Sequence, residues 1–512
     1  MTATTQAPAP ENPLVEGLER LPVHPTSLAI FGATGDLANR KLLPAIYNLA
    51  HDGALPERFE LIGISRAEMT DAEFREMAIQ AVRKFSRRPP DDDVLQRLFE
   101  NARYVAGTFD QDTLYPGLAT ALDGFDKEAG QRLNRCFYLS TAPSFFPVIV
   151  GKLGQQGLDH HEGAEVRVII EKPFGTTLEE AQELNREVLS VFDEQQVFRI
   201  DHYLGKETVQ NIMAFRFANG MFEPLWNRNF IDNVQITAAE DIGIGTRAGY
   251  YDSAGAMRDL IQNHMLQLLC HVAMEPPVSF SADEVRNEKV KVLHAIERPS
   301  PDDVANIAVR AQYTAGTSGG DRVKGYTEEE GVPADSHTET YAAVRLEVDN
   351  WRWAGVPFYL RTGKRLARKV TEIAITLKPV PHLGFTQDGS VGVRPNQLVL
   401  TLQPNEGVSL QLAAKIPGTR MRITPVNMEF LYGTTFLSQS PEAYERLILD
   451  AMRGDATLFT RNDEVEAQWR IIDPVVQAWG QSAAGVGEYP AGSQGPADAD
   501  RLLVGDDVWR SI

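Results

Sequence analysis

The stretch Arg199–Glu207, Arg-Ile-Asp-His-Tyr-Leu-Gly-Lys-Glu, gathers side chains that can do chemistry. It directly continues a run at 197–200 that predicts a strand. The imidazole, phenol and ammonium groups of His202, Tyr203 and Lys206 would suit a phosphate, because the amides at the start of a helix favour anions. Asp201 beside them is an acceptor that could orient a histidine from elsewhere in the chain. A solvated helix start with ordinary surface charges is the competing interpretation.

A second histidine lies in a pattern that predicts a helix at 252–274. The segment Arg258-Asp-Leu-Ile-Gln-Asn-His264 precedes an apolar run there. A single histidine in an amphipathic helix is commonly a satisfied structural residue. His264 and His271 are seven residues apart, but no carboxylate stands at metal-ligand spacing, so we expect no metal site.

A glycine-rich turn follows the first apolar run of the chain. Ser27–Phe31 predicts a short buried strand, which continues into Gly32-Ala-Thr-Gly-Asp-Leu-Ala38 and then a helical pattern. In a dinucleotide turn the first glycine permits the tight bend, and the second lets a pyrophosphate approach the backbone. The turn alone is a weak signal, but its setting between strand and helix strengthens the prediction of a nucleotide site.

Two further predicted strands end in basic side chains. The run 59–64 continues into Ser65-Arg66, at the place where dinucleotide folds meet the adenosine ribose and where an arginine suits a 2′-phosphate. The run 166–170 continues into Glu171-Lys172-Pro173, which would put Lys172 at the ligand-binding edge of a parallel sheet. An arginine on an exposed loop and a surface lysine are the plainer interpretations.

The composition limits the class of protein and its partners. The 512 residues are enough for two or three domains, and the net charge of −20 argues against nucleic acid or an anionic membrane as a partner. Two cysteines exclude a disulfide framework, and no apolar run reaches the roughly 18 residues of a membrane span. Residues 1–25 lack a targeting signal, so we expect a disordered leader on a cytoplasmic protein.

After about residue 201 the pattern changes from βα units to alternating strands, as in the runs 398–402 and 408–412. We therefore predict an α/β Rossmann-like dinucleotide-binding domain at 26–201. We predict an α+β domain at 202–512, with a large, mainly antiparallel sheet that serves substrate binding and oligomerisation. Within it we expect a long loop at 316–335 and a largely irregular tail from Ala483.

Five segments together resemble the glucose-6-phosphate dehydrogenases of the bacterial type. In the order of that family they are Gly32–Lys41, Glu171–Gly175, Arg199–Glu207, Arg258–His264 and Arg361–Lys364. The resemblance spans about residues 26–480, and the Arg199–Glu207 segment is its most specific part. It implies an NADP-dependent dehydrogenase (EC 1.1.1.49) that oxidises D-glucose 6-phosphate to 6-phosphoglucono-1,5-lactone, the first step of the oxidative pentose phosphate pathway.

The resemblance also implies roles for individual residues. His264 would be the general base, oriented by Asp201. The groups around the substrate phosphate would be His202, Tyr203, Lys206, Lys364 and Lys369, and those on the sugar hydroxyls Glu240 and Asp259, with Lys172 between substrate and coenzyme. The coenzyme would lie against Gly32, Ala33, Thr34, Gly35, Asp36, Leu37, Lys41, Arg66 and Lys172.

Two other functions fit part of the pattern. A sugar oxidoreductase of the glucose–fructose oxidoreductase type also pairs a glycine-rich turn with Glu-Lys-Pro, but would leave the phosphate cluster unexplained. A non-catalytic NADP(H) sensor would keep the turn and need no histidine paired with an aspartate. We expect a homodimer or homotetramer, because a broad antiparallel sheet with one exposed face suits an isologous interface.

Overall fold

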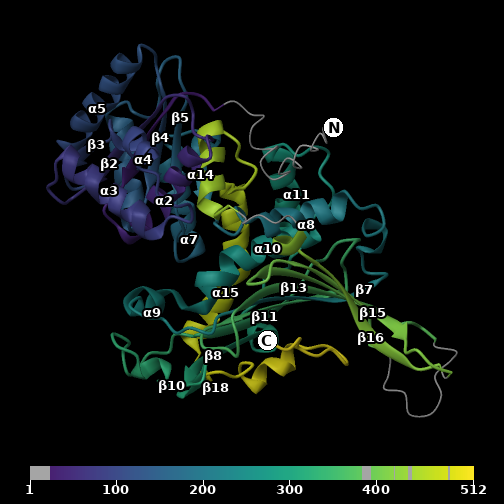
Figure 1. Ribbon diagram of the computed structural model, residues 1–512. Coiled ribbons are helices and arrows are strands. Elements are labelled where there is room, and N and C mark those ends of the chain that lie inside the picture. The colour runs from purple at the N-terminus through teal and green to yellow at the C-terminus, as the bar shows by residue number, and fades with distance from the viewer. Residues whose placement is uncertain (1–22, 383–393, 420, 436–440, 483–484) are drawn as a thin grey trace, which may run out of the picture. The chain divides into compact units, whose positions relative to one another are not determined.

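A computed structural model describes residues 23–382, 394–419, 421–435, 441–482 and 485–512 (Figure 1). The leader expected at 1–25 lies outside the described residues up to position 22. The chain forms two compact units, of which the first comprises 1–175, 179–206 and 440–462. The second comprises 176–178, 207–439 and 463–512. The first unit thus includes residues 440–462, which a single domain boundary near residue 201 would assign to the second domain.

The first unit is a Rossmann-like fold on a seven-stranded sheet in the order β17–β6–β5–β4–β1–β2–β3. All neighbouring strands are parallel except the short β17, which runs antiparallel to β6. β1 and β5 are buried along their whole length, which explains their nearly continuous apolar sequences. The strands are β1 (Thr26–Phe31), β2 (Phe59–Ser65), β3 (Arg103–Ala106), β4 (Asn134–Leu139), β5 (Val166–Ile170), β6 (Val197–Ile200) and β17 (Phe459–Thr460).

Helices from both ends of the chain pack around this sheet. They are η1 (Ala38–Leu42), α2 (Leu43–His51), α3 (Asp71–Phe85), α4 (Asp92–Phe99), α5 (Leu114–Ala129), α6 (Phe146–Gln155), α7 (Leu178–Leu189) and α14 (Ala443–Arg453). Phe31, Phe137 and Phe146 belong to the apolar core. Glu445 ties α14 into the unit, because its carboxylate accepts hydrogen bonds from Asn48 (2.8 Å) and Arg87 (2.6 Å).

The second unit is built on a nine-stranded sheet in the order β16–β15–β14–β13–β7–β12–β11–β8–β18. Of its neighbouring pairs, β7 with β12 and β8 with β18 are parallel and the rest are antiparallel, so the predicted fold class is confirmed. The strands are β7 (Ile231–Ala239), β8 (Ala308–Thr314), β11 (Tyr341–Glu347), β12 (Pro357–Gly363), β13 (Val370–Leu377), β14 (Gln397–Gln403), β15 (Gly407–Lys415), β16 (Ile423–Leu431) and β18 (Gly487–Pro490).

Helices cover one face of this sheet. Figure 1 shows α8 (Glu207–Phe217), α10 (Leu266–Ala273) and α11 (Ala282–Ala295) on that face and the C-terminal segment on the other. The single helix expected at 252–274 is instead α9 (Ala248–Ala256), the π-helix η5 (Met257–Met265) and α10. Gly255, with φ +69° and ψ 170°, breaks the helical path just before η5. The long helix α15 (Asn462–Gln481) also belongs to this unit, from Asp463 onward.

Two segments expected to be irregular contain regular structure. In the tail, β18 pairs with β8 and the 3-10 helix η7 (Ala497–Leu502) follows. The expected loop at 316–335 contains a short hairpin of β9 (Gly316–Ser318) and β10 (Asp321–Val323). Outside such short elements the described residues of both segments are irregular, as expected. Strand pairing is what composition could not reveal: Tyr489 of β18 is 1% exposed in a core that contains several other tyrosines.

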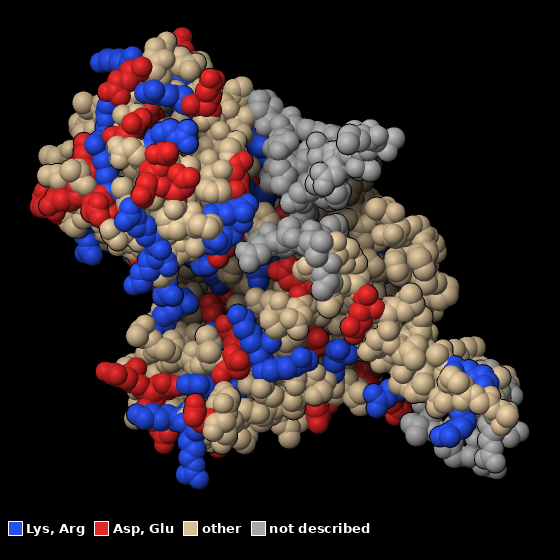
Figure 2. All heavy atoms as spheres, in the orientation of Figure 1, with Lys and Arg blue, Asp and Glu red and all other residues tan. Residues whose placement is uncertain are grey.

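Acidic and basic side chains are interspersed over the face of each unit that Figure 2 shows. Among the described residues, no helix is both long enough and apolar enough to cross a membrane.

Candidate active site

The carboxyl edge of the first unit's sheet carries most of the residues that the sequence singled out. Gly32 follows β1, Arg66 follows β2 and Glu171-Lys172 follows β5, while Asp201 is the first residue after β6. The strands are parallel, so these residues emerge at one edge, where open α/β sheets bind their ligands.

The turn after β1 has the geometry of a nucleotide cradle. Gly32 has φ +87°, and a Cβ there would come within 2.1 Å of the Ser140 carbonyl oxygen, so no other residue fits. Thr34 and Ser65 share a hydrogen bond of 2.8 Å that joins this turn to the tip of β2. Asn39 Nδ2 donates to the carbonyls of Thr34 and Gly35, which fixes the turn against the start of the helix. The arrangement fits a pyrophosphate at the helix N-terminus.

Arg66 is the first residue beyond β2 and is exposed, whereas Ser65 is buried. The tip of β2 therefore presents a guanidinium where an NAD site would present a carboxylate, which fits a 2′-phosphate. Asp36, Leu37 and Ala33 lie in the turn as expected, and Asp36 is an exposed partner of Arg40 at 3.7 Å.

Two lysines flank this edge. Lys41 Nζ lies 2.9 Å from both carboxylate oxygens of Glu442, the residue before α14. Both side chains are exposed, and such pairs contribute little stability. Lys172 is half-buried and precedes Pro173 through a cis peptide bond.

Glu171 beside Lys172 is a buried carboxyl that the sequence analysis did not single out. Tyr138 donates a 2.6 Å hydrogen bond to its Oε1, and Tyr444 of α14 bonds to it as well. Burial raises the pKa of Glu171 from its ordinary 4.5 to about 7. No sequence signal linked Tyr444 to this place, because it lies far along the chain.

The segment after β6 forms a tight turn with its polar groups held in place. Asp201 is 3% exposed, and its Oδ1 accepts the Tyr203 backbone N–H at 2.9 Å. The His202 ring is nearly parallel to that of Tyr444, with centroids 6.3 Å apart. Lys206 Nζ lies 4.1 Å from the centroid of the Tyr203 ring. The structure thus brings together an imidazole, a phenol and an ammonium at the sheet edge, as the sequence predicts.

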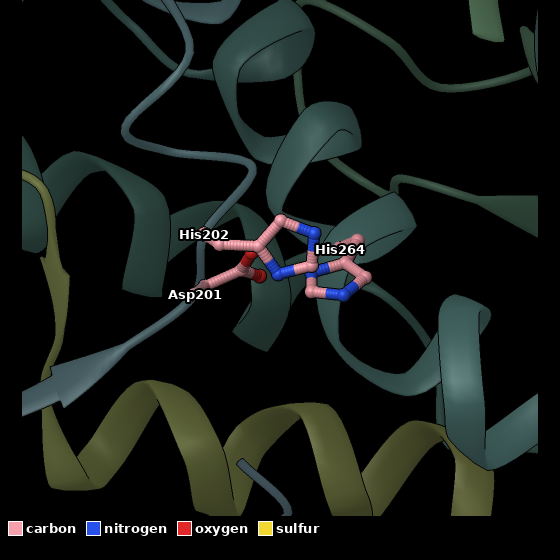
Figure 3. Close-up of side chains that lie close together, drawn as sticks. All are labelled: Asp201, His202 and His264. Carbon is pink, nitrogen blue, oxygen red and sulfur yellow. The ribbon is translucent and has the colours of Figure 1, made fainter. Parts of the chain in front are cut away.

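In the second unit, His264 is fully buried in the π-helix η5. Asn263 Oδ1 accepts the His264 backbone N–H at 2.7 Å, and Asn263 Nδ2 donates to the Arg258 carbonyl at 3.0 Å. π-Helical segments are rare in proteins and frequently occur at functional sites. Figure 3 shows Asp201 and His202 where the chain leaves β6, and His264 on the ribbon of η5.

The other predicted substrate groups of the second unit differ in exposure. Lys364 Nζ donates to Glu240 Oε2 just beyond the ends of β12 and β7. Asp259 is buried in η5, where Tyr250 bonds to it. Lys369 is exposed in the loop before β13. The structure therefore pairs Lys364 with Glu240 and leaves Lys369 at the surface.

Models of known families match almost the whole fold. Residues 29–211 match the glucose-6-phosphate dehydrogenase NAD binding domain, and residues 213–510 match the glucose-6-phosphate dehydrogenase C-terminal domain.

Curated proteins and solved structures of high similarity have the same description. Glucose-6-phosphate 1-dehydrogenase 2 of Mycobacterium tuberculosis is 49% identical over 497 residues, which cover 96% of this chain and 96% of the relative. Glucose-6-phosphate 1-dehydrogenase of Aggregatibacter actinomycetemcomitans is 46% identical, covering 94% and 97%. A solved glucose-6-phosphate dehydrogenase in complex with its substrate glucose-6-phosphate aligns with a TM-score of 0.86 at 35% identity, covering 95% of this chain and 99% of that one. Glucose-6-phosphate 1-dehydrogenase from Mycobacterium avium aligns with a TM-score of 0.82 at 38% identity, covering 95% and 98%.

Proposed function

Because the chain belongs to the glucose-6-phosphate dehydrogenase family, we propose that His264 is the general base of its reaction and that Asp201 orients this histidine. The reaction is the NADP-dependent oxidation of D-glucose 6-phosphate to 6-phosphoglucono-1,5-lactone, the first step of the oxidative pentose phosphate pathway. The predicted family, activity and coenzyme are confirmed. Neither a glucose–fructose oxidoreductase-type enzyme nor a non-catalytic sensor is favoured.

The base must take the proton of the C1 hydroxyl as hydride leaves C1 for the nicotinamide. A neutral imidazole suits this task, since the ordinary pKa of histidine lies close to working pH. The burial of His264 and of Asp201 carries the proposal, because a charge pair is stronger in a site that excludes water. Asp201 would accept the other ring N–H, which fixes the tautomer and stabilises the imidazolium. Its hydrogen bond from Tyr203 keeps the carboxylate in one orientation.

The phosphate site would depend on local cations, because the chain as a whole is strongly acidic. His202, Tyr203 and Lys206 offer an imidazole, a phenol and an ammonium directly after β6. Lys364 and Lys369 would add positive charge from the second unit, and Glu240 and Asp259 would accept hydrogen bonds from sugar hydroxyls. Binding energy from the phosphate, remote from the reacting carbon, holds C1 in position for hydride transfer.

NADP supplies the hydride acceptor when it is bound. The turn from Gly32 to Leu37 would receive its pyrophosphate, and Arg66 its 2′-phosphate. Lys41 would exchange Glu442 for a phosphate oxygen, and Lys172 would lie between coenzyme and substrate. The fit of the turn to a pyrophosphate supports this assignment, since the backbone at Gly32 leaves no space for a side chain.

Replacing His264 by asparagine tests the base. We expect kcat to fall by about 10²–10⁴ while the KM for glucose 6-phosphate changes little, because asparagine keeps the volume but not the basicity. Asp201→Asn should show a milder loss. If His264→Asn kept more than about a tenth of kcat, well above the loss expected for a missing base, the role would pass to Lys172, a half-buried lysine after β5.

The same side chains allow a second assignment that the test must separate. Asp201, His202 and His264 are residue types that hold metal ions. The proposed mechanism has no step that requires one, so dialysis against a chelator should leave activity unchanged. Loss of activity on chelation, with recovery on adding a single divalent metal, would reassign these side chains as ligands.

Two further parts of the proposal concern the protein's state in the cell. We propose a homodimer or homotetramer in the cytoplasm, with neither nucleic acid nor membrane as a partner. β16 supports the oligomer, because it is an edge strand of the nine-stranded sheet and exposes Val426, Met428 and Phe430. Apolar edge strands pair readily with a second chain unless they are protected.

A further inference from the structure

Arg365 has a backbone conformation that is unusual for its residue type. Its φ is +51°, and it is the one non-glycine residue with a positive φ in the described part of the chain. This left-handed region is disfavoured for residues with a Cβ. Such residues persist where the surroundings over-determine them, and they cluster at functional sites. Arg365 directly follows Lys364, whose ammonium pairs with Glu240.

Backbone hydrogen bonds hold Arg365 from both sides. Its N–H donates to the Ile242 carbonyl at 3.1 Å, and its carbonyl accepts the Gly492 N–H at 2.7 Å. The neighbouring N–H groups are also paired, at 2.8–2.9 Å: Lys364 to Thr340, Leu366 to Glu240 and Ala367 to Ser493. The loop is therefore fixed residue by residue.

Part of this support comes from Tyr489–Ser493, which we call the clamp segment. Gly492 and Ser493 supply backbone partners to the loop, and the Tyr489 hydroxyl donates to the Lys364 carbonyl at 2.6 Å. Tyr489 is 1% exposed, and burial raises its pKa well above the usual value, so the hydroxyl remains a donor at working pH. Its position comes from β18, where Tyr489 pairs with Tyr313 of β8.

We propose that the clamp segment, through Tyr489, holds Arg365 in the left-handed conformation and so fixes the direction in which Lys364 presents its ammonium group. If Arg365 relaxed to a right-handed conformation, the peptide group between it and Lys364 would turn, and the Lys364 side chain would leave Glu240. Tyr489 is a positioning residue, because it touches the backbone of Lys364 rather than the substrate. The inference rests on the proposed role of Lys364 in substrate binding.

The Arg365 side chain makes separate contacts, which the test must control. Its guanidinium lies 3.6 Å from Glu329. It also lies over Gly243, where a Cβ would meet Arg365 Nε at 2.9 Å. Alanine at 365 removes these contacts and keeps the Cβ, whereas glycine removes them and makes the left-handed backbone free of strain. The difference between the two variants isolates the backbone.

The first experiment compares Tyr489→Phe with Tyr115→Phe. Both tyrosines are 1% exposed, and each hydroxyl donates to a backbone carbonyl, Tyr489 to Lys364 at 2.6 Å and Tyr115 to Phe109 at 2.7 Å. The Tyr489 hydroxyl also lies 3.0 Å from Thr340 Oγ1 and 3.2 Å from the Thr340 carbonyl oxygen. We expect Tyr489→Phe to raise the KM for glucose 6-phosphate about three- to tenfold, the effect of losing the hydrogen bond to Lys364, with the KM for NADP little changed. Tyr115→Phe should lower thermal stability through the loss of its one hydrogen bond to a backbone carbonyl and leave both KM values in place.

The second experiment is a rescue. In the Tyr489→Phe background, Arg365→Gly should recover most of the lost affinity for glucose 6-phosphate, and Arg365→Ala should not. Equal behaviour of the two variants, or no rise in KM for Tyr489→Phe, would overturn the clamp. Lys364→Ala is the reference: if it leaves the KM for glucose 6-phosphate unchanged, the proposed role of Lys364 fails. If Lys364→Ala raises the KM for glucose 6-phosphate but Tyr489→Phe does not, the role of Lys364 stands and only the proposed role of the clamp segment is wrong.

Discussion

Glu171 should make the stability of the first unit depend on pH in a direction opposite to that of most acidic residues. The perturbation is Glu171→Gln, which keeps the shape of the side chain and removes its titration. Glu171 faces the hydroxyls of Tyr138 and Tyr444 and the backbone and ammonium group of Lys172. The two tyrosines also have raised pKa values, so they remain protonated donors around the carboxyl.

The expected magnitude follows from the two pKa values of Glu171, 4.5 as the ordinary value and about 7 in the folded protein. The folded state binds the proton more tightly, so the stability that Glu171 contributes is complete below about pH 4.5 and is lost as pH rises through about 7. Because one pKa unit corresponds to about 1.4 kcal/mol, the total loss is about 3.5 kcal/mol. Burial is the largest cause of the raised value, and the side chain is 8% exposed.

Urea unfolding between pH 5 and 8.5 measures this effect. All six tryptophans lie in the second unit, so far-UV circular dichroism is the better probe for the first. Relative to Glu171→Gln, the wild type should lose about 2.5 kcal/mol of unfolding free energy across that range, because part of the loss occurs below pH 5. Glu68→Gln, at an exposed glutamate of the same unit, controls for the loss of a charge. A constant difference between wild type and Glu171→Gln at every pH would refute the reasoning.

Three further outcomes are expected. Arg66→Ala should raise the KM for NADP about tenfold or more, the effect of one lost charged hydrogen bond, and leave the KM for NAD nearly unchanged. Equal effects on both coenzymes would show that Arg66 does not bind the 2′-phosphate. Lys206→Ala should raise the KM for glucose 6-phosphate strongly and leave the slow turnover of free glucose unaffected. If the turnover of free glucose fell just as much, Lys206 would have a structural role instead of binding the phosphate. Phe430→Glu on β16 should lower the mass measured by sedimentation, because a charge at a sheet edge opposes pairing; an unchanged mass would place the oligomer interface elsewhere.

Much of the fold, and the place of the candidate site residues in it, could be predicted because both depend on local pattern. In parallel sheets, ligand-binding residues follow the strands directly, so an apolar run such as Val166–Ile170 points to Lys172 without knowledge of the fold. The same logic located Gly32, Arg66 and Asp201. The family resemblance then supplied roles that residue types alone leave open, as for His264.

The groups that support these residues lie far away in the sequence and leave no local signal. Lys41 meets Glu442 across 401 residues, and Tyr444, from the same late segment, is the partner of Glu171. Composition predicted a largely irregular C-terminal tail, but nothing in it indicated that Tyr489 would donate a hydrogen bond to Lys364. Such contacts depend on which elements the fold brings together, and no periodicity within one segment encodes that.

This difference has a mechanistic consequence. In the proposed mechanism Lys206 and His264 act through their own functional groups, so their replacement should change one kinetic parameter sharply. Supporting residues act by excluding alternative backbone conformations. Their loss therefore lowers the population of the binding-competent conformation and does not remove a contact with the substrate. Arg365 shows why the support must be strong: a residue with a Cβ stays left-handed only while the sum of its hydrogen bonds exceeds the cost of that conformation. We therefore expect graded, rescuable effects at Tyr489 and abrupt ones at His264, although both are almost completely buried.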